Sequence, residues 1–257
     1  MIPNSTVIQE FPHNDWQTLR RLKRREATPT VLCKTPRAAQ PNAADVEMLA
    51  REYALLRDLD LAGVPRALEF IRQDQHTCLV LEDNGGAPLT STPSLPEFFN
   101  LATQLAALLA ELHRREITHQ HLNPHAILQH PATGALTLTD FSLATRGAAA
   151  RPPQLPRGSL AYVAPEQTGR TQRAVDYRAD FYSLGAVFYE WLTGRPPFES
   201  ADPLELLHWH IAKAPTPPHE VNRALPAPLG QIVLKLLAKN PDDRYQSAAG
   251  LQADLER

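Results

Sequence analysis

The sequence predicts an α+β fold in which a small strand-rich part comes first and a larger, mostly helical part follows. The chain has 257 residues, which is enough for one large domain or for two small lobes around a cleft. Short apolar and β-branched runs dominate residues 1–80, whereas apolar residues recur mainly at helical spacing from residue 101 onward. The glycine-containing break at residues 83–86 separates these two patterns and is interpreted as a linker.

The first part is predicted to contain two strands and one main helix. Residues 30–34 form a partly β-branched run after a proline, and residues 77–81 form a fully apolar run, so both are expected to be strands. Between them, residues 44–58 have apolar side chains at helical spacing, with Arg and Glu between them. This pattern predicts an amphipathic helix beside the strands.

The second part is predicted to be a series of helices. Apolar residues recur at helical spacing over residues 101–113, 180–192, 204–211, 229–238 and 248–255. Ser247 is a candidate N-cap for the last of these helices, because a serine hydroxyl can accept from the free N–H groups of a first turn. Residues 136–139 alternate like a short strand, and the proline-rich residues 148–156 are expected to be an exposed loop.

Composition excludes several classes of function. The formal net charge is −2, so nothing global favours nucleic acid as a partner. Cys33 and Cys78 lie in no metal-binding spacing, and we expect two buried thiols in a reducing cytoplasm. The N-terminus lacks the charged and apolar regions of a signal peptide, and no apolar stretch approaches the length of a membrane span. We therefore expect a cytoplasmic protein that does not insert into a membrane.

Short motifs follow one another along the chain in a definite order. They are Val31-Leu-Cys-Lys34, Glu52 in the predicted helix, Leu81-Glu82-Asp83, the segment from His119 to Leu128, Asp140-Phe-Ser142, the segment from Gly158 to Ala164-Pro-Glu166, Asp180 to Gly185, and Arg244. In this order and spacing, the motifs resemble those of the eukaryotic-like Ser/Thr protein kinase family over nearly the whole chain. The resemblance implies a two-lobed fold, with an antiparallel-sheet N-lobe over residues 1–84 and a helical C-lobe over residues 85–257.

The resemblance also implies roles for particular residues. Lys34 is expected to contact the phosphates of ATP while paired with Glu52. Glu82 and Asp83 are expected at the hinge that meets adenine, and Asp140 is expected to bind Mg²⁺. In the C-lobe, the resemblance implies a structural ion pair between Glu166 and Arg244, and a structural anchor at Asp180 under the catalytic loop.

Other positions depart from the family pattern. His121 stands where the catalytic aspartate is expected, and Ala126, which cannot coordinate a metal, stands where an asparagine supplies the second Mg²⁺ ligand. Asn123 replaces the usual lysine of the catalytic loop, Gln120 replaces the arginine that reads a phosphorylated loop, and Ser142 replaces the glycine after Asp140-Phe.

The phosphate-covering loop departs as well. Residues 11–25 stand where glycines normally let backbone N–H groups approach phosphate, but they contain no glycine. Their basic residues, Arg20, Arg21, Lys23, Arg24 and Arg25, are interpreted as a solvated strand face or hairpin.

A narrower resemblance concerns the larger protein to which such a domain can belong. The segments at residues 162–170, 176–185, 202–206 and 243–247 resemble kinase-like domains at the N-terminus of large bacterial sensor proteins. In those proteins an AAA-type ATPase region, a GAF domain and a histidine kinase follow. The resemblance implies that this chain is an N-terminal piece whose partners are other proteins or other domains of the same polypeptide.

Three hypotheses follow from the sequence. The first is a pseudokinase, a kinase-shaped regulatory module with impaired or absent phosphotransfer, in which ATP and weakened Mg²⁺ binding remain open. The second is an active Ser/Thr kinase with His121 as an unusual base, motivated by Lys34, Glu52 and Asp140. The third is a small-molecule phosphotransferase, against which the peptide-positioning segment at residues 158–166 argues.

Overall fold

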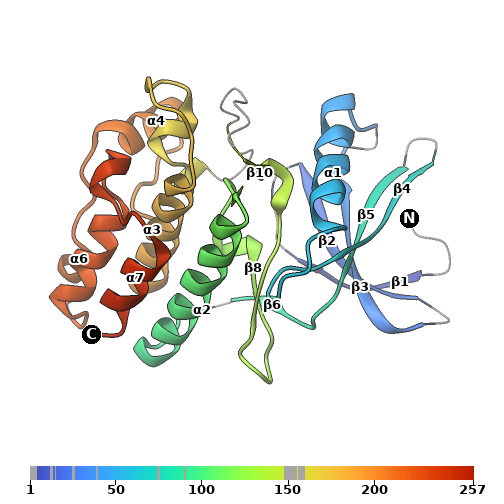
Figure 1. Ribbon diagram of the computed structural model, residues 1–257, viewed down its shortest axis with the longest axis horizontal. Coiled ribbons are helices and arrows are strands. Elements are labelled where there is room, and N and C mark those ends of the chain that lie inside the picture. Colours follow the sequence, from blue (N-terminus) through green and yellow to red (C-terminus); the bar gives the residue numbers. More distant parts are fainter. Residues whose placement is uncertain are drawn as a thin grey trace. The chain divides into compact units, whose positions relative to one another are not determined.

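The structure is a computed structural model that describes residues 5–11, 14, 16–24, 27–38, 40–73, 76–89, 91–147, 155 and 160–257. The chain divides into two compact units (Figure 1). Unit 1 comprises Met1–Leu89 and Pro124–Leu143, and unit 2 comprises Thr90–Asn123 and Ala144–Arg257. The predicted α+β class is confirmed, because unit 1 is built on an antiparallel sheet and unit 2 is mostly helical.

The main sheet of unit 1 has five antiparallel strands in the order β1-β2-β3-β5-β4. They are β1 (Ser5–Phe11), β2 (Gln17–Arg24), β3 (Ala27–Pro36), β4 (Ala67–Gln73) and β5 (His76–Glu82). Helix α1 (Ala43–Leu56) contacts β4 and β5, and its first turn is capped by Asn42, whose side chain accepts from the Asp45 N–H. The structure therefore confirms the strands predicted at residues 30–34 and 77–81 and the helix predicted at residues 44–58.

Strand register assigns side chains to the two faces of this sheet. Lys34 pairs with Leu19 on one side and Leu79 on the other, so these three side chains share a face. We call this the Lys34 face; by the same alternation it carries Phe11, Leu19, Arg21, Leu32, Lys34, Leu79 and Leu81. The opposite face, here the Cys33 face, holds a buried cluster of Leu22, Val31, Cys33, Cys78 and Val80.

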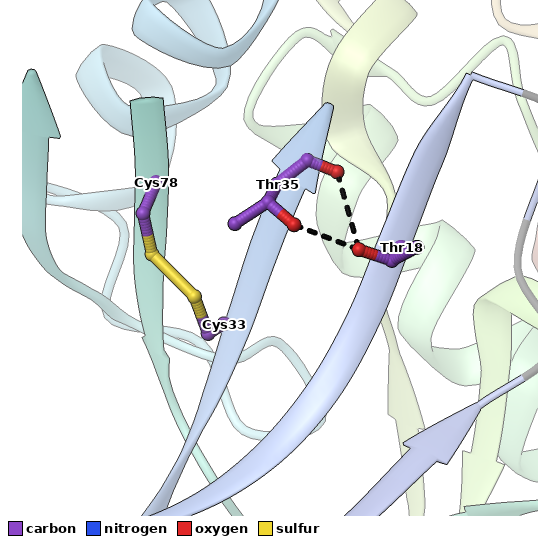
Figure 2. Close-up of a disulfide and its surroundings, with 4 residues drawn as sticks. All are labelled: Thr18, Cys33, Thr35 and Cys78. Carbon is purple, nitrogen blue, oxygen red and sulfur yellow. Dashed lines mark hydrogen bonds between the residues drawn. A yellow bond between two sulfur atoms is a disulfide. The ribbon is translucent and has the colours of Figure 1, made fainter. Parts of the chain in front are cut away.

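The prediction of two separate buried thiols is wrong, because Cys33 and Cys78 form a disulfide. Figure 2 shows the bond joining β3 to β5, with the side chain of Thr18 on β2 bonded to Thr35 on β3 nearby. The two cysteines are 45 residues apart and become neighbours only through strand pairing, with their Cα atoms 6.3 Å apart. Strand β3, which carries Lys34, is thus tied to its neighbours on both sides.

A smaller sheet completes unit 1 and leads to Asp140. It consists of β6 (Ala87–Pro88), β8 (Ile127–Gln129) and β9 (Leu136–Leu138) in the order β6-β8-β9. The predicted strand at residues 136–139 is therefore confirmed. After β9 the chain passes through Asp140 into a short 3-10 helix (Phe141–Leu143) that packs against α1.

Unit 2 is built from packed helices. They are α2 (Leu95–Arg114), α3 (Arg178–Thr193), α4 (Pro203–Ala212), α5 (Pro218–Val221), α6 (Ala227–Leu236) and α7 (Ala248–Leu255). Helix α2 packs against α3 and α7, and α3 packs against α6 (Figure 1). Gly185 permits the last contact, because a Cβ atom there would lie 2.7 Å from the Leu236 Cβ.

The helices predicted in the second part of the chain are all present, and the predicted cap is confirmed by the Ser247 hydroxyl, which accepts from the Gly250 N–H. Two short strands, β7 (Ile117–Thr118) and β10 (Thr145–Arg146), pair beside them. The predicted loop at residues 148–156 lies outside the described residues except for Leu155. Throughout the ranges that the structure describes, the helices are too short or too polar to cross a bilayer.

Candidate functional site

Three charged side chains meet on the Lys34 face of unit 1. Lys34 Nζ lies 2.9 and 2.7 Å from the two carboxylate oxygens of Glu52, and 2.8 Å from Asp140 Oδ1. Strand β3, helix α1 and the segment after β9 each supply one of these residues. The pairing of Lys34 with Glu52 expected from sequence is present, and Asp140 joins them in a single buried network.

Burial and charge act against each other in this network. Burial lowers the pKa of Lys34, but the carboxylates of Asp140 and Glu52 outweigh it and raise the pKa above the ordinary lysine value. Burial raises the pKa of Glu52, and Lys34 together with the Phe141 N–H offsets only part of that effect. Lys34 is therefore held as a cation by its two carboxylate neighbours.

Asp140 is held within the chain through both of its carboxylate oxygens. Its backbone adopts the left-handed conformation at φ 64°, which Asp tolerates better than most residues. Besides Lys34, the Ser142 hydroxyl donates to Oδ1 at 2.8 Å, and Asn14 Nδ2 donates to Oδ2 at 3.2 Å. The side chain that replaces the family glycine, Ser142, thus bonds directly to the residue expected to bind metal.

Asn14 lies between β1 and β2, in the part of the chain that stands in place of the glycine loop. Its side-chain oxygen accepts from the N–H groups of Trp16 at 3.2 Å and Gln17 at 2.8 Å. Arg37 Nε donates to the carbonyls of Asn14 and Gln17, at 2.9 and 3.1 Å. A glycine loop would direct backbone N–H groups at phosphate, whereas those of Trp16 and Gln17 are bonded to Asn14.

The predicted adenine-binding hinge is engaged by an arginine. Asp83 accepts from Arg21 Nε at 2.7 Å and from Arg21 Nη2 at 3.0 Å, and Arg21 Nη2 also donates to the Gly86 carbonyl at 2.5 Å. Burial raises the pKa of Asp83, but hydrogen bonds from Arg21, Thr30 and the Gly85 N–H lower it overall. Glu82 is exposed, and its N–H donates to the Arg66 carbonyl.

The other basic residues of β2 fit the expected solvated strand only in part. Lys23 is exposed, and Arg20 pairs with Glu10 at the surface. Arg24 pairs with Glu69, but its Nε and Nη2 atoms are buried. Arg25 lies outside the described residues. Sequence reasoning did not separate Arg21 from this cluster, although its register opposite Leu32 places it on the Lys34 face.

The start of the catalytic loop, in unit 2, keeps its supporting framework. Asp180 on α3 accepts from the N–H groups of His119 at 2.9 Å and Gln120 at 2.8 Å. His121, at the position of the catalytic aspartate, is buried with 3% of its surface exposed, and its carbonyl accepts from Asn123 Nδ2 at 2.8 Å. The backbone arrangement is therefore well supported, although the catalytic carboxylate is absent from the sequence.

Ala126, at the position of the second metal ligand, lies in unit 1. Its methyl group is buried, and its carbonyl accepts from the Thr139 N–H at 2.7 Å and the Thr139 hydroxyl at 3.0 Å. Alanine offers no side-chain oxygen, and its backbone oxygen already has two donors. In the part of the chain that the structure describes, no three His, Cys, Asp or Glu side chains gather to hold a metal.

The ion pair expected in unit 2 is present. Arg244 Nη1 and Nη2 lie 2.7 and 2.9 Å from the two oxygens of Glu166, which is the bidentate geometry that suits guanidinium and carboxylate. Arg244 also donates to three backbone carbonyls, those of Ala238, Arg178 and Lys239. Gln120 makes a different contact from the arginine it replaces, since its side-chain amide donates to the Thr145 hydroxyl at 2.7 Å.

Comparison with known proteins agrees with these features. The protein kinase domain family matches residues 18–255, so the chain belongs to that family. Serine/threonine-protein kinase PknB of Mycobacterium tuberculosis is 40% identical over 149 residues, which is 56% of this chain and 23% of PknB. Serine/threonine-protein kinase Pkn1 of Myxococcus xanthus is 33% identical over 224 residues, which is 82% of this chain and 32% of Pkn1.

A third relative is a signalling protein of another kind. Hybrid signal transduction histidine kinase G of Dictyostelium discoideum is 56% identical over 95 residues, which is 37% of this chain but 3% of that protein. The chain thus matches less than a third of the length of each of these relatives. The predicted two-lobed kinase fold and the Ser/Thr kinase relationship are confirmed.

Members of this family in general use ATP and Mg²⁺. The residues of unit 1 do not fit these groups in the observed arrangement. Both oxygens of Asp140 are bonded within the chain, its side chain is 1% exposed, and the second metal position is Ala126.

Proposed function

We propose that this chain is a kinase-shaped regulatory module of a larger signalling protein and that it does not transfer phosphate. The observation that carries the proposal is the paired loss at the catalytic loop, where His121 and Ala126 replace the proton-accepting and metal-binding side chains. The loop keeps its support from Asp180, so the fold is retained while the chemistry is missing. Phosphoryl transfer is catalysed mostly by positioning the reacting groups and neutralising their charge. The replacement of the proton acceptor and that of the metal ligand are therefore both expected to lower the rate of transfer.

The proposed partners are proteins or other domains of the same polypeptide, acting in the cytoplasm. The 56% identity to part of a hybrid signal transduction histidine kinase supports a place in a sensor protein, as does the sequence resemblance to sensor-linked kinase-like domains. In such a protein the module would act through its surface.

An active Ser/Thr kinase is the second candidate, because the pairing of Lys34 with Glu52 and Asp140 is intact. His121 would then accept the substrate proton. A general base must come within about 2.6–3.2 Å of the group that it deprotonates. The 3% exposure of His121 leaves little of its surface available to a peptide hydroxyl, which favours the first candidate.

The two candidates differ in one assay. The purified domain is incubated with radiolabelled ATP, Mg²⁺ or Mn²⁺, and generic Ser/Thr protein substrates, beside an Asp140→Asn variant whose folding is checked by circular dichroism. We expect the same background label with both proteins. Label that the wild type transfers and the variant does not would establish an active kinase and refute the proposal.

A further inference from the structure

We infer that the chain closes its own nucleotide position, with Asn14 at the phosphate end and Arg21 at the adenine end. The domain would then hold its conformation without ATP or Mg²⁺. This inference deepens the proposed function and rests on it. A regulatory module of this kind would respond to its protein partners rather than to nucleotide. All of the residues involved lie in unit 1.

The phosphate end is closed by hydrogen bonds to the groups that would meet phosphate and metal. Asn14 is itself buried, with 6% of its surface exposed, and it donates to Asp140 Oδ2. The side chain of Lys34 has no exposed surface, and its ammonium group bonds to the carboxylates of Glu52 and Asp140. Because Lys34 is expected to stay paired with Glu52 when it contacts phosphate, a phosphate oxygen that approached Lys34 would have to displace Asp140, leaving that buried carboxylate without its cation.

Asn14, Trp16 and Gln17 are held in place by Arg37. The Arg37 side chain donates to the carbonyls of Asn14 and Gln17, and the Arg37 N–H donates to the Trp16 carbonyl at 2.8 Å. Trp16 and Gln17 are both buried. A glycine loop can move its backbone toward a ligand at low cost, whereas moving these three residues would expose buried side chains and break these bonds.

The adenine end is closed by Arg21. Its guanidinium runs from β2 to the segment after β5, where it makes a bidentate contact with Asp83 and donates to the Gly86 carbonyl. It also lies over the ring of Phe11, with its central carbon 5.0 Å from the ring centroid. Phe11 faces Leu19 across β1 and β2.

The apolar side chains of the same face show that this surface is already covered. Leu19, Leu32 and Leu81 have between 0% and 1% of their surface exposed, because other residues of the chain cover them. An adenine ring binds by burying such side chains, and here they have almost no exposed surface left to bury. The pair between Arg21 and Asp83 would also have to open, at the expense of two partly or fully buried charges.

Isothermal titration calorimetry with ATP, in the presence and absence of Mg²⁺, tests this inference by gain of binding. The variants are Asn14→Gly, Arg21→Ala and the two combined. Arg20→Ala is the matched control, because Arg20 is on the same strand but on the Cys33 face, where it pairs with Glu10 at the surface. Circular dichroism confirms that each variant is folded before titration.

We expect no binding to the wild type or to Arg20→Ala at ATP concentrations up to about 1 mM. The combined variant should bind at least tenfold more tightly than this limit, and a gain in Asn14→Gly alone also supports the inference. ATP binding by the wild type overturns the inference, as does the absence of any gain in the folded combined variant.

Hydrogen exchange on the wild type gives a readout that needs no variant. Peptides covering residues 14–24 and 83–86 should exchange slowly, and at the same rate with and without Mg-ATP. Protection induced by Mg-ATP overturns the inference.

The failure of this inference is distinguishable from the failure of the proposed function. Wild-type ATP binding without phosphotransfer refutes the closed position and leaves the regulatory module, whereas phosphotransfer refutes the module itself.

Discussion

Each unit contains a buried network of charged side chains. The two networks differ in whether their residues stand at positions that bind ATP and metal in kinases. In unit 2, Arg244 forms a bidentate pair with Glu166 and donates to three backbone carbonyls, as expected of a structural ion pair. In unit 1, Lys34, Glu52 and Asp140 occupy positions that serve ATP and metal in kinases; Lys34 keeps the expected pair with Glu52 and also bonds to Asp140, the expected metal ligand.

The difference bears on the proposal that the chain keeps Lys34, Glu52 and Asp140 without transferring phosphate. The network of unit 2 matches the family pattern and supports the fold. The network of unit 1 also includes Asn14 and Ser142, which stand where the family pattern has glycines and which both donate to Asp140. We propose that Lys34, Glu52 and Asp140 act as structural residues as well, and stability measurements can test whether the two networks are equivalent.

The largest expected effect is in unit 2. Arg244→Met leaves the Glu166 carboxylate buried without its cation, and three carbonyls lose a donor. We expect a loss of about 3–5 kcal/mol in the free energy of unfolding, measured by urea denaturation. The matched control is Arg244→Met combined with Glu166→Met, which should lose less because no charge is stranded. A single-variant loss below about 1 kcal/mol would contradict the structural role.

Lys34→Met tests whether unit 1 behaves in the same way. The substitution leaves Glu52 and Asp140 buried as neighbours without a cation, and we expect a loss of about 3 kcal/mol at pH 8. Without Lys34 the folded protein binds protons at these carboxylates more readily than the unfolded chain does, so the variant should recover stability as the pH falls from 8 to 5. A loss that is small at pH 8, or that does not shrink toward pH 5, would show that these residues are not structural.

His210 gives a smaller, pH-dependent effect in unit 2. Burial, with a further contribution from Lys239, lowers the pKa of His210 to about 3, and its Nδ1 lies 3.0 Å from the Tyr182 hydroxyl. The unfolded chain therefore binds a proton that the folded chain does not between pH 6.5 and 3. The stability associated with neutral His210 is present above pH 6.5 and falls by about 1.4 kcal/mol per pH unit below it.

The measurement for His210 is chemical denaturation between pH 7 and 4.5. His210→Gln should lose less stability over this range than the wild type, because glutamine does not titrate. Parallel pH profiles for the two proteins would mean that other groups account for the acid sensitivity.

The smallest expected effect is that of Ser142→Ala in unit 1. The hydroxyl donates one hydrogen bond to Asp140, which keeps its contacts with Lys34 and Asn14 in the variant. We expect a loss of about 1 kcal/mol, seen as a lower urea midpoint with an unchanged slope. An increase in stability would argue that Ser142 strains the backbone after Asp140 more than its hydrogen bond stabilises it.

Local patterns predicted much of the fold and part of the site. Apolar spacing identified α1 and the main helices of unit 2, and motif order brought together Lys34, Glu52 and Asp140 although 106 residues separate the first from the last. Motif order also predicted the pair of Glu166 with Arg244. These predictions succeed because each element carries its own periodicity and each motif has a fixed place in the fold.

The remaining contacts depend on tertiary neighbours that no local pattern specifies. Asn14 reaches Asp140 across 126 positions, and Arg21 reaches Asp83 across 62. Arg21 looked like one member of a basic run, and only its strand register distinguishes it from Arg20. The sequence offered two signals, which are a polar residue (Asn14) in place of a glycine and a basic residue (Arg21) before the predicted hinge. Neither signal indicates which partner the side chain contacts.

Thermal unfolding of the wild-type domain with and without saturating Mg-ATP tests the central claim most directly. A ligand that binds only the folded state raises Tm by mass action, and ATP at one hundred times its Kd would add about 2.7 kcal/mol. Because Asn14 and Arg21 are proposed to close the nucleotide position, we predict an unchanged Tm. A rise in Tm that requires Mg²⁺ and disappears in Asp140→Asn would contradict the account and show a working nucleotide site.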